Sequence, residues 1–248
     1  MQYEFHGEFN QVLVLVPMAD IKAYNDIVKY LRLAKVSLVA VSKTKPPQEI
    51  MALYNAGQRL FGENYVQEIT GKYEQLPKDI EWHFIGHLQT NKVKYLAPFI
   101  HTIQSVDSLK LLNEIDKQAA KNNRIITCLL EIHVAQEDTK FGLSFDDARQ
   151  IILYDGIKGL HNVKITGLMG MASLTEDEVQ IRREFHSIKA FFNELNEQLV
   201  SRSAPLTTLS VGMSGDYKVA VEEGSNMVRI GSLLFGKRES SKLSEGNL

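Results

Sequence analysis

Residues 37–47 read SLVAVSKTKPP, a short run of β-branched and small residues that leads into two lysines and two prolines. Successive side chains of an extended strand point to opposite faces, so Val39, Val41 and Lys43 lie on the same side. A helical pattern follows around residues 47–56 and predicts a helix there. The stretch therefore predicts a buried strand that is followed by a helix.

This pattern of a strand and then a helix recurs along the chain. Strands that alternate with helices pair in parallel through right-handed crossovers, and eight such units close into a barrel. We therefore predict an α/β fold that is a single (β/α)8 TIM barrel, with a doubly wound open sheet as the alternative. The predicted strands are 37–43, 59–64, 81–86, 102–106, 126–134, 165–172, 208–213 and 227–231. The predicted helices are 20–33, 47–56, 65–75, 90–97, 108–123, 144–156, 177–200, 216–223 and a short one after 232.

The two ends of the chain do not follow this repeat. The helix over 20–33 precedes the first strand, Asp20 is suited to cap it, and we expect it to cover the floor or the side of the barrel. Met18 is a candidate alternative start, in which case the residues before it are dispensable. The predicted boundaries are 1–17 for a disordered or dispensable extension, 18–238 for the barrel and 239–248 for a tail.

The composition excludes several classes of protein. The 248 residues carry 28 Lys plus Arg against 30 Asp plus Glu, so the net charge of −2 gives no bulk attraction to nucleic acid or anionic membranes. No apolar run approaches the length of a membrane span or of a secretory signal. The single cysteine, Cys128, forms no intramolecular disulfide, and no CxxC motif or His/Cys cluster suggests zinc. We expect a cytoplasmic protein without a metal.

Barrels of this kind place their functional groups on the loops after the carboxyl ends of the strands. Lys43 ends the first predicted strand with its side chain directed inward. Lys45 lies about 7 Å further along an extended chain, beside Pro46, and we expect it to have left the barrel. A lysine amine held over a barrel core loses hydration, which lowers its pKa and makes it a nucleophile toward aldehydes. The alternative for Lys43 is a surface ion pair.

The loops after the last two strands are rich in small residues. They read MSGD after the seventh strand and IGS after the eighth, and barrels often bind phosphate with these two loops and the start of a short helix. Gly231 allows close approach of the backbone, while Ser214 and Ser232 add hydroxyl groups. Asp216 is a candidate N-cap of the next helix. The alternative is that both stretches are ordinary turns.

Arg229 shares its strand face with Met227 and Gly231, so it points inward beside the predicted phosphate site. It could bind the phosphate with two hydrogen bonds or donate to the nitrogen of an aromatic ring, and the alternative is an ion pair with a carboxylate such as Glu63. A nucleophilic lysine, a phosphate site and an arginine between them describe a pocket for pyridoxal 5′-phosphate (PLP).

The chain carries the motifs VAVSKTKP, FGENYVQE, WHFIGHLQTNK, SVD at 105–107, KFG at 140–142, TGLMGMA and VRIGSLLFG. Together they closely resemble the motifs of the pyridoxal phosphate homeostasis protein family, also called YggS or PROSC. The resemblance runs in order from about residue 36 to residue 236, which is nearly the whole predicted barrel.

The resemblance implies a barrel like the N-terminal domain of alanine racemase, with Lys43 as the Schiff-base lysine. It also implies phosphate contacts from Ser214, Gly231 and Ser232, and Arg229 facing the pyridine nitrogen. An arginine donor leaves that nitrogen unprotonated, so the ring is a poorer electron sink. The second base of alanine racemase comes from a C-terminal domain, which we expect to be absent here.

The function that the resemblance implies is PLP binding and homeostasis, as a carrier or regulator without an established reaction. We expect a monomer, because the sequence shows no long apolar patch and no heptad repeat. Possible recipients of the cofactor are apo-forms of PLP-dependent enzymes. One alternative is a single-domain enzyme of the racemase type, and another is a barrel that binds a different phosphorylated metabolite.

A few further residues are candidates for the same pocket. Asn64 ends the second predicted strand and could contact the ligand, and His83 or His87 could pack against the ring or accept a proton. Lys140 could act as a second amine. The face shared by Met169 and Met171 is expected to be part of the core and not a ligand wall.

Overall fold

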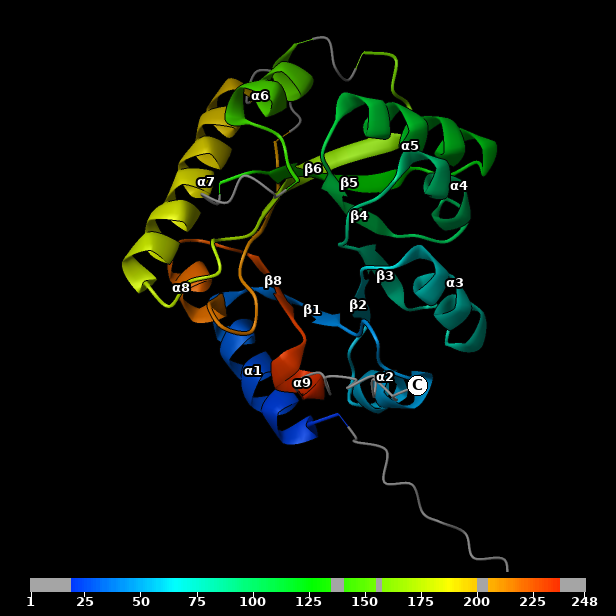
Figure 1. The fold of residues 1–248 in the computed structure, drawn as a ribbon, viewed down its shortest axis with the longest axis vertical. Coiled ribbons are helices and arrows are strands. Elements are labelled where there is room, and N and C mark those ends of the chain that lie inside the picture. Colours follow the sequence, from blue (N-terminus) through cyan, green and yellow to red (C-terminus); the bar gives the residue numbers. More distant parts are fainter. Residues whose placement is uncertain (1–18, 135–140, 155–157, 200–204, 237–248) are drawn as a thin grey trace, which may run out of the picture.

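The computed structural model describes residues 19–134, 141–154, 158–199 and 205–236. The predicted extension and tail, Met18 and Lys140 lie outside the described residues. Eight parallel strands pair in sequence order, and the last pairs with the first, so the sheet is a closed barrel (Figure 1). The prediction of a TIM barrel is confirmed, and the open sheet is excluded. The strands are β1 (Ser37–Val41), β2 (Leu60–Glu63), β3 (Glu81–Phe84), β4 (Thr102–Val106), β5 (Ile126–Ile132), β6 (Val163–Gly170), β7 (Thr208–Ser210) and β8 (Met227–Ile230).

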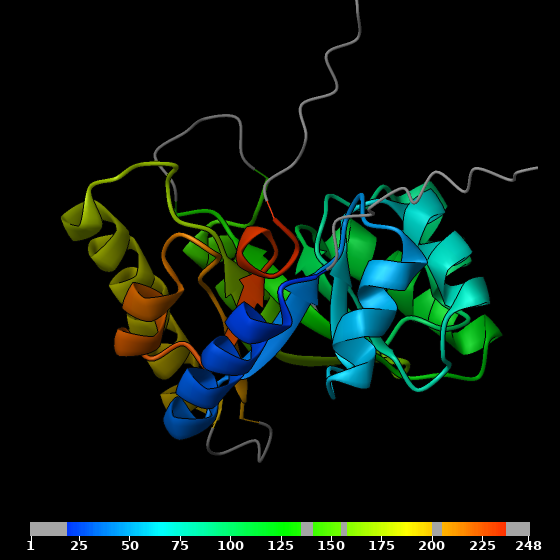
Figure 2. The same ribbon diagram turned by 90° about the horizontal axis from the view of Figure 1, so that it is seen from below.

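The helices surround the strands as an outer ring (Figure 1). The short helix α9 lies at the end of the barrel toward which the strands point (Figure 2). Within the described ranges, no helix combines the length and the apolar character that crossing a membrane requires. The helices are α1 (Ile21–Ala34), α2 (Pro47–Asn55), α3 (Val66–Gln75), the 3₁₀ helix η1 (Thr90–Lys92), α4 (Val93–Leu96), α5 (Leu109–Lys121), α6 (Phe145–Leu153), α7 (Glu178–Leu199), α8 (Tyr217–Glu222) and α9 (Ser232–Phe235).

Helix α1 covers the side of the barrel. Its N-cap is Asp20, whose Oδ1 accepts a hydrogen bond of 2.9 Å from the Ala23 amide, as the sequence predicted. The helix packs against β1, α2 and α9, and the ring of Tyr30 meets that of Tyr217 in α8 edge-on at 5.9 Å. Because α9 has only four residues, it is too short to cover the seam between β8 and β1. Helix α1 takes that place.

Most of the apolar core lies between the outer face of the strands and the helices. Phe61, Trp82 and Phe84 from β2 and β3 are fully buried there, and the rings of Phe61 and Trp82 lie 6.1 Å apart. Cys128 in β5 is buried in the same layer, and burial raises the pKa of its thiol. Cys128 therefore acts as a small buried residue of the apolar core.

Polar side chains lie inside the barrel together with branched apolar residues. A chain of hydrogen bonds runs along it from β8 to β3. Arg229 Nη1 donates to Ser210 Oγ at 2.8 Å, and the Ser210 hydroxyl donates to Gln104 Oε1 at 2.7 Å. Gln104 Nε2 lies 2.7 Å from His83 Nδ1. Burial lowers the pKa of His83 to about 3, so its ring is neutral at physiological pH.

Candidate functional site

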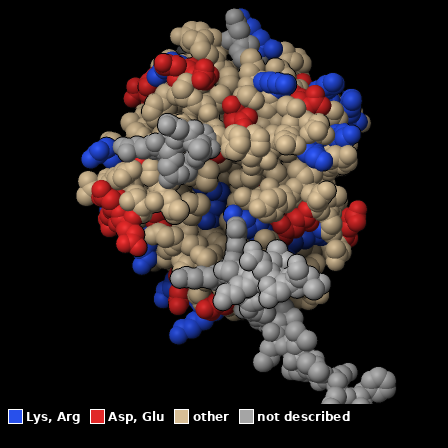
Figure 3. Space-filling model, viewed as in Figure 1, with Lys and Arg blue, Asp and Glu red and all other residues tan. Residues whose placement is uncertain are grey.

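A cavity of about 310 Å³ opens at the carboxyl ends of the strands. Lysine and arginine side chains appear within the hollow at the centre of this face (Figure 3). Loops after β1, β2, β3, β6, β7 and β8 contribute to its wall, so segments far apart in the sequence meet there. All six predicted site residues line it, and their role as ligands of a cofactor stays a prediction. They are Lys43, Asn64, Ser214, Arg229, Gly231 and Ser232.

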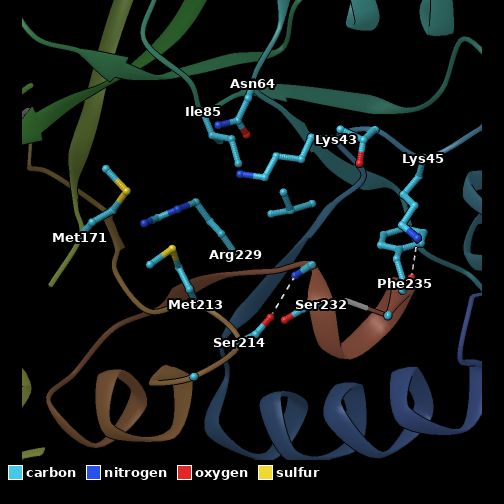
Figure 4. Close-up of a pocket in the computed structure, with 15 residues that line it drawn as sticks. Lys43, Lys45, Asn64, Ile85, Met171, Met213, Ser214, Arg229, Ser232 and Phe235 are labelled. Carbon is cyan, nitrogen blue, oxygen red and sulfur yellow. Dashed lines mark hydrogen bonds between the residues drawn. The ribbon is translucent and has the colours of Figure 1, made fainter. Parts of the chain in front are cut away.

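Lys43 lies two residues after the end of β1 and extends into the cavity toward Asn64 and Ile85 (Figure 4). The next residue, Thr44, has a φ of 66°, a left-handed conformation that is uncommon for a threonine. The chain therefore turns sharply after Lys43, and the surrounding structure must hold this turn in place.

A buried charged network holds the backbone on both sides of Lys43. The Lys72 ammonium, from α3, donates to the Ser42 carbonyl at 2.8 Å and to Glu63 Oε1 at 2.7 Å. It also donates to Glu68 at 2.6 Å, and the same Glu68 oxygen accepts the Thr44 amide. The Ser42 hydroxyl donates to Glu63 at 2.6 Å. Lys72 and its two carboxylates thus fix the carbonyl before Lys43 and the amide after it.

Glu63 is fully buried, and burial raises its pKa to about 7 although Lys72 and the Ser42 hydroxyl act in the opposite direction. It lies on the outer face of β2, toward α3, and not inside the barrel. The sequence-based alternative of an ion pair between Arg229 and Glu63 is therefore wrong, since the two side chains leave the sheet on opposite faces.

Lys45 also differs from its prediction. It lines the same cavity as Lys43, because the turn at Thr44 bends the chain back toward the barrel mouth. Its Nζ donates to the carbonyl of Phe235 at 2.6 Å, at the end of α9, and lies 3.5 Å from Glu49 Oε2 (Figure 4). These contacts hold its ammonium at the rim of the cavity.

The wall opposite Lys43 is formed by the two small-residue loops. Ser214 Oγ accepts a hydrogen bond of 3.3 Å from the Gly231 amide, which joins the loops after β7 and β8, and Ser232 begins α9 beside them (Figure 4). A Cβ at Gly231 would lie 3.1 Å from the carbonyl oxygen of Val41, so glycine allows close packing on β1. Asp216 precedes α8 as predicted, but its carboxylate accepts from the Met213 amide and does not cap the helix.

Arg229 is almost fully buried between these loops and the barrel interior. Nη1 donates to the Ser210 carbonyl at 2.7 Å and Nη2 to the Gly170 carbonyl at 2.9 Å. Burial lowers the pKa of Arg229 to about 10, which leaves it charged at neutral pH. Among the described residues Nε has no hydrogen-bond partner, so it remains available to a ligand.

Two further buried groups belong to this region. Burial raises the pKa of Glu131, on β5, to about 7, and the positive charge of Arg229 opposes this shift. Asn64 Oδ1 is buried and has no hydrogen-bond partner within the described part of the chain. A Cβ at Gly86 would lie 2.4 Å from the Asn64 carbonyl oxygen, so the absence of a side chain at Gly86 sets the position of Asn64.

Apolar side chains complete the wall. Met171 lines the cavity whereas Met169 is buried inside the barrel, so the prediction that both belong to the core is wrong for Met171. Ile85 and Met213 also line the cavity and were not predicted. Ile85 has the same strand parity as His83, and this alternation was the signal that could have identified it.

The histidines of the WHFIGH motif do not line this cavity. His83 lies deeper in the barrel, where its Nδ1 shares a hydrogen bond with Gln104 Nε2. The His87 ring stacks on that of Phe141 at 3.7 Å, and its Nδ1 lies 3.2 Å from Asp107 Oδ2. Lys140, the predicted second amine, lies outside the described residues.

The chain is similar to known proteins over most of its length. Residues 22–239 match the family model of the alanine racemase N-terminal domain. A pyridoxal phosphate homeostasis protein of Aquifex aeolicus is 43% identical over 203 residues, which cover 82% of this chain and 87% of that protein. One from Schizosaccharomyces pombe is 32% identical over 212 residues, 85% of this chain and 87% of that protein. The structure of PipY from Synechococcus elongatus with PLP bound has a TM-score of 0.79 at 34% identity, and the match covers 87% of this chain and 99% of PipY.

Proposed function

The chain belongs to the pyridoxal phosphate homeostasis protein family, and we propose that it holds PLP as a Schiff base on Lys43 and takes part in the homeostasis of this cofactor. One observation carries the proposal. Lys43, from the end of β1, and Arg229 and Ser232, from β8 and the start of α9, project into one cavity of about 310 Å³. An amine, a guanidinium and a hydroxyl group are thus brought together around a space of the size of a small ligand.

The residues present fit the chemical groups of PLP. Lys43 supplies the amine for its aldehyde, and the hydroxyls of Ser214 and Ser232 supply donors for its phosphate. Arg229 Nε, which has no partner among the described residues, is a donor for the pyridine nitrogen. Asn64 Oδ1, which is buried and has no partner among the described residues, is an acceptor that a ligand hydroxyl would satisfy.

The environment of Arg229 favours binding over broad catalysis. When bound, PLP can stabilise a carbanion, and it does so best when its ring nitrogen is protonated. Arg229 stays charged at neutral pH because its pKa, though lowered, is about 10. A permanent donor facing the ring nitrogen keeps that nitrogen unprotonated, since the nitrogen must accept the hydrogen bond. This supports a carrier or regulator, which we place in the cytoplasm as a monomer that supplies apo-enzymes.

The test uses the purified full chain incubated with PLP. The wild type is expected to show a visible absorption band that borohydride abolishes, leaving a reduced adduct on the peptide that contains Lys43. Lys43→Ala should lose the adduct, whereas Lys45→Ala, the matched control from the same cavity, should retain it. A reduced adduct on another lysine in Lys43→Ala would contradict the assignment. A wild type that takes up no PLP would favour a different phosphorylated ligand.

Two further measurements separate a carrier from a racemase-like enzyme. Transfer of PLP from the loaded protein to an apo-enzyme, without turnover of amino acids, is expected for a carrier. Exchange of the α-hydrogen of an amino acid for solvent deuterium at catalytic rates would instead identify an enzyme.

A further inference from the structure

The opposite end of the barrel carries a cluster of three groups that the cofactor site does not use. Glu81 and His83 share one face at the amino end of β3, and His101 directly precedes the neighbouring strand β4. One ligand atom from each lies within 4.8 Å of the other two, and Glu81 Oε2 is 3.8 Å from His101 Nε2. The three residues line a cavity of about 200 Å³.

Both histidines are held through the same ring nitrogen. His83 Nδ1 lies 2.7 Å from Gln104 Nε2, and His101 Nδ1 lies 2.8 Å from Thr102 Oγ1. This leaves Nε2 of each ring for the cluster. A histidine that binds a metal is almost always oriented in this way, by a hydrogen bond at its other nitrogen.

The buried member of the cluster is His83, and one of its two ring nitrogens is unsatisfied within the described part of the chain. His83 is 2% exposed, and its Nε2 has no hydrogen-bond partner among the described residues. A surface ion pair would account for Glu81 and His101, whose side chains are 46% and 49% exposed, but it leaves the His83 nitrogen unsatisfied. A third group bound between them would satisfy all three.

We propose that Glu81, His83 and His101 bind a divalent transition-metal ion of the zinc class. Two imidazoles and one carboxylate are a ligand set that zinc accepts, and three protein ligands leave a fourth position for water at the mouth of the cavity. Ligand atoms of a tetrahedral site lie about 3.3 Å apart. The three ligand atoms now lie within 4.8 Å of one another, so zinc binding requires the exposed Glu81 and His101 side chains to move toward the buried His83.

Metal binding determines the orientation of Gln104. A metal-bound Nε2 requires the proton of His83 on Nδ1, so Gln104 must present its carbonyl oxygen to that nitrogen. A half-turn of the Gln104 amide achieves this. It exchanges the oxygen and the nitrogen, which have nearly the same shape, so no other heavy atom has to move. Gln104 Nε2 then donates to Ser210 Oγ, which has a second lone pair beside the bond from Arg229.

The sequence predicted no metal because the three ligands match no familiar spacing. Glu81 and His83 are two residues apart, and His101 comes from the next unit of the barrel. Parallel pairing of β3 with β4, in which His83 lies opposite Thr102, brings them together.

The test is a zinc titration of the full chain, produced without a histidine tag and freed of metal by a chelator. Equilibrium dialysis with metal analysis should give one zinc ion per chain. His101→Gln and Glu81→Gln should each raise the dissociation constant at least tenfold. Thr102→Val, which removes only the hydrogen bond that orients His101, should raise it about 10- to 100-fold.

The matched control is His186→Gln. His186 Nδ1 lies 3.3 Å from Glu223 Oε2, so it is another histidine–carboxylate pair, and it is not part of the three-residue cluster. This variant should bind zinc like the wild type. Co²⁺ in place of zinc should give the visible bands of a tetrahedral site in the wild type and in His186→Gln, and lose them in His101→Gln.

Equal zinc affinity in His101→Gln, Glu81→Gln and the wild type would overturn the proposal, as would a wild type that binds no zinc. Circular dichroism of the metal-free variants verifies that each is folded. The measurement involves neither Lys43 nor PLP, so its outcome is independent of the proposed function.

Discussion

Replacing Lys72 by methionine tests whether the buried network under the first loop positions Lys43. Methionine keeps the length of the side chain but removes the ammonium, which donates to the Ser42 carbonyl, Glu63 and Glu68 at 2.6 to 2.8 Å. Glu63, with no exposed surface, is then left with the Ser42 hydroxyl alone among these partners.

The expected loss of stability in Lys72→Met follows from the burial of Glu63. Removing one partner of a buried ion pair costs about 3 to 5 kcal/mol, because the other charge stays desolvated. For a chain of this size, about 2 to 4 °C of melting temperature correspond to each kcal/mol, so Lys72→Met should melt about 6 to 20 °C lower. The pKa of Glu63, already raised to about 7, should rise further without the ammonium. The loss should therefore be smaller at pH 5, where Glu63 is neutral, than at pH 8.

Urea unfolding at both pH values measures this loss, and the rate of Schiff-base formation with PLP reports on Lys43. Lys117→Met is the control, since Lys117 is 63% exposed and lies 3.8 Å from Glu114; it should change stability by less than about 1 kcal/mol. Adding Glu63→Gln to Lys72→Met should recover at least about 1 kcal/mol by removing the unpaired charge.

The reasoning is refuted if Lys72→Met unfolds within about 1 kcal/mol of the wild type at pH 8. An unchanged rate of Schiff-base formation in a folded Lys72→Met protein would show that the network stabilises the loop without positioning the lysine.

Three other changes test the cavity. Arg229→Ala should raise the dissociation constant of PLP at least tenfold in equilibrium dialysis, and should also cost about 2 to 4 kcal/mol in urea unfolding because the guanidinium ties β8 to β6 and β7. Gly86→Ala should weaken PLP binding about tenfold, or about 1.4 kcal/mol, since its Cβ would meet the Asn64 carbonyl at 2.4 Å; Gly71→Ala, in open space on α3, should bind normally. Burial raises the pKa of Glu131 from 4.5 to about 7, so its stabilising contribution is complete below pH 4.5 and is lost as the pH rises through 7. The PLP-free wild type should lose about 3 kcal/mol over this range from Glu131, and Glu131→Gln should show a correspondingly flatter profile in urea unfolding.

Local patterns were enough to predict the barrel. Short runs of β-branched residues between helical patterns located all eight strands, and the predicted 165–172 differs from the observed Val163–Gly170 by two residues at each end. The helices followed from their periodicity and from caps such as Asp20. Lys43 and Arg229 were placed correctly in the cavity because strand parity alone decides on which side of the sheet a residue lies.

The sequence-based predictions are wrong where a contact depends on how the closed barrel brings distant segments together. Lys45 was predicted to leave the barrel on the assumption of an extended chain, but the left-handed turn at Thr44 brings it back. Glu68 and Lys72 have the i, i+4 spacing of an ordinary helix-surface pair, and the sequence does not show that this face of α3 lies under the first loop. The chain of hydrogen bonds inside the barrel links side chains of β3, β4, β7 and β8. Local sequence patterns do not relate residues on these separate strands.

The seam between β1 and β8 has a consequence for how the protein becomes functional in the cell. Lys43 follows the first strand, whereas Arg229 and Ser232 lie on and after the last, and these two strands pair with each other. During synthesis on a ribosome, the edge of β1 that pairs with β8 stays unpaired until nearly the whole chain has emerged. An unfinished or truncated chain therefore carries Lys43 but not Arg229 and Ser232, which line the same cavity. Under the proposed function, only completed molecules bind PLP in this cavity, so cofactor occupancy reports that the polypeptide is complete.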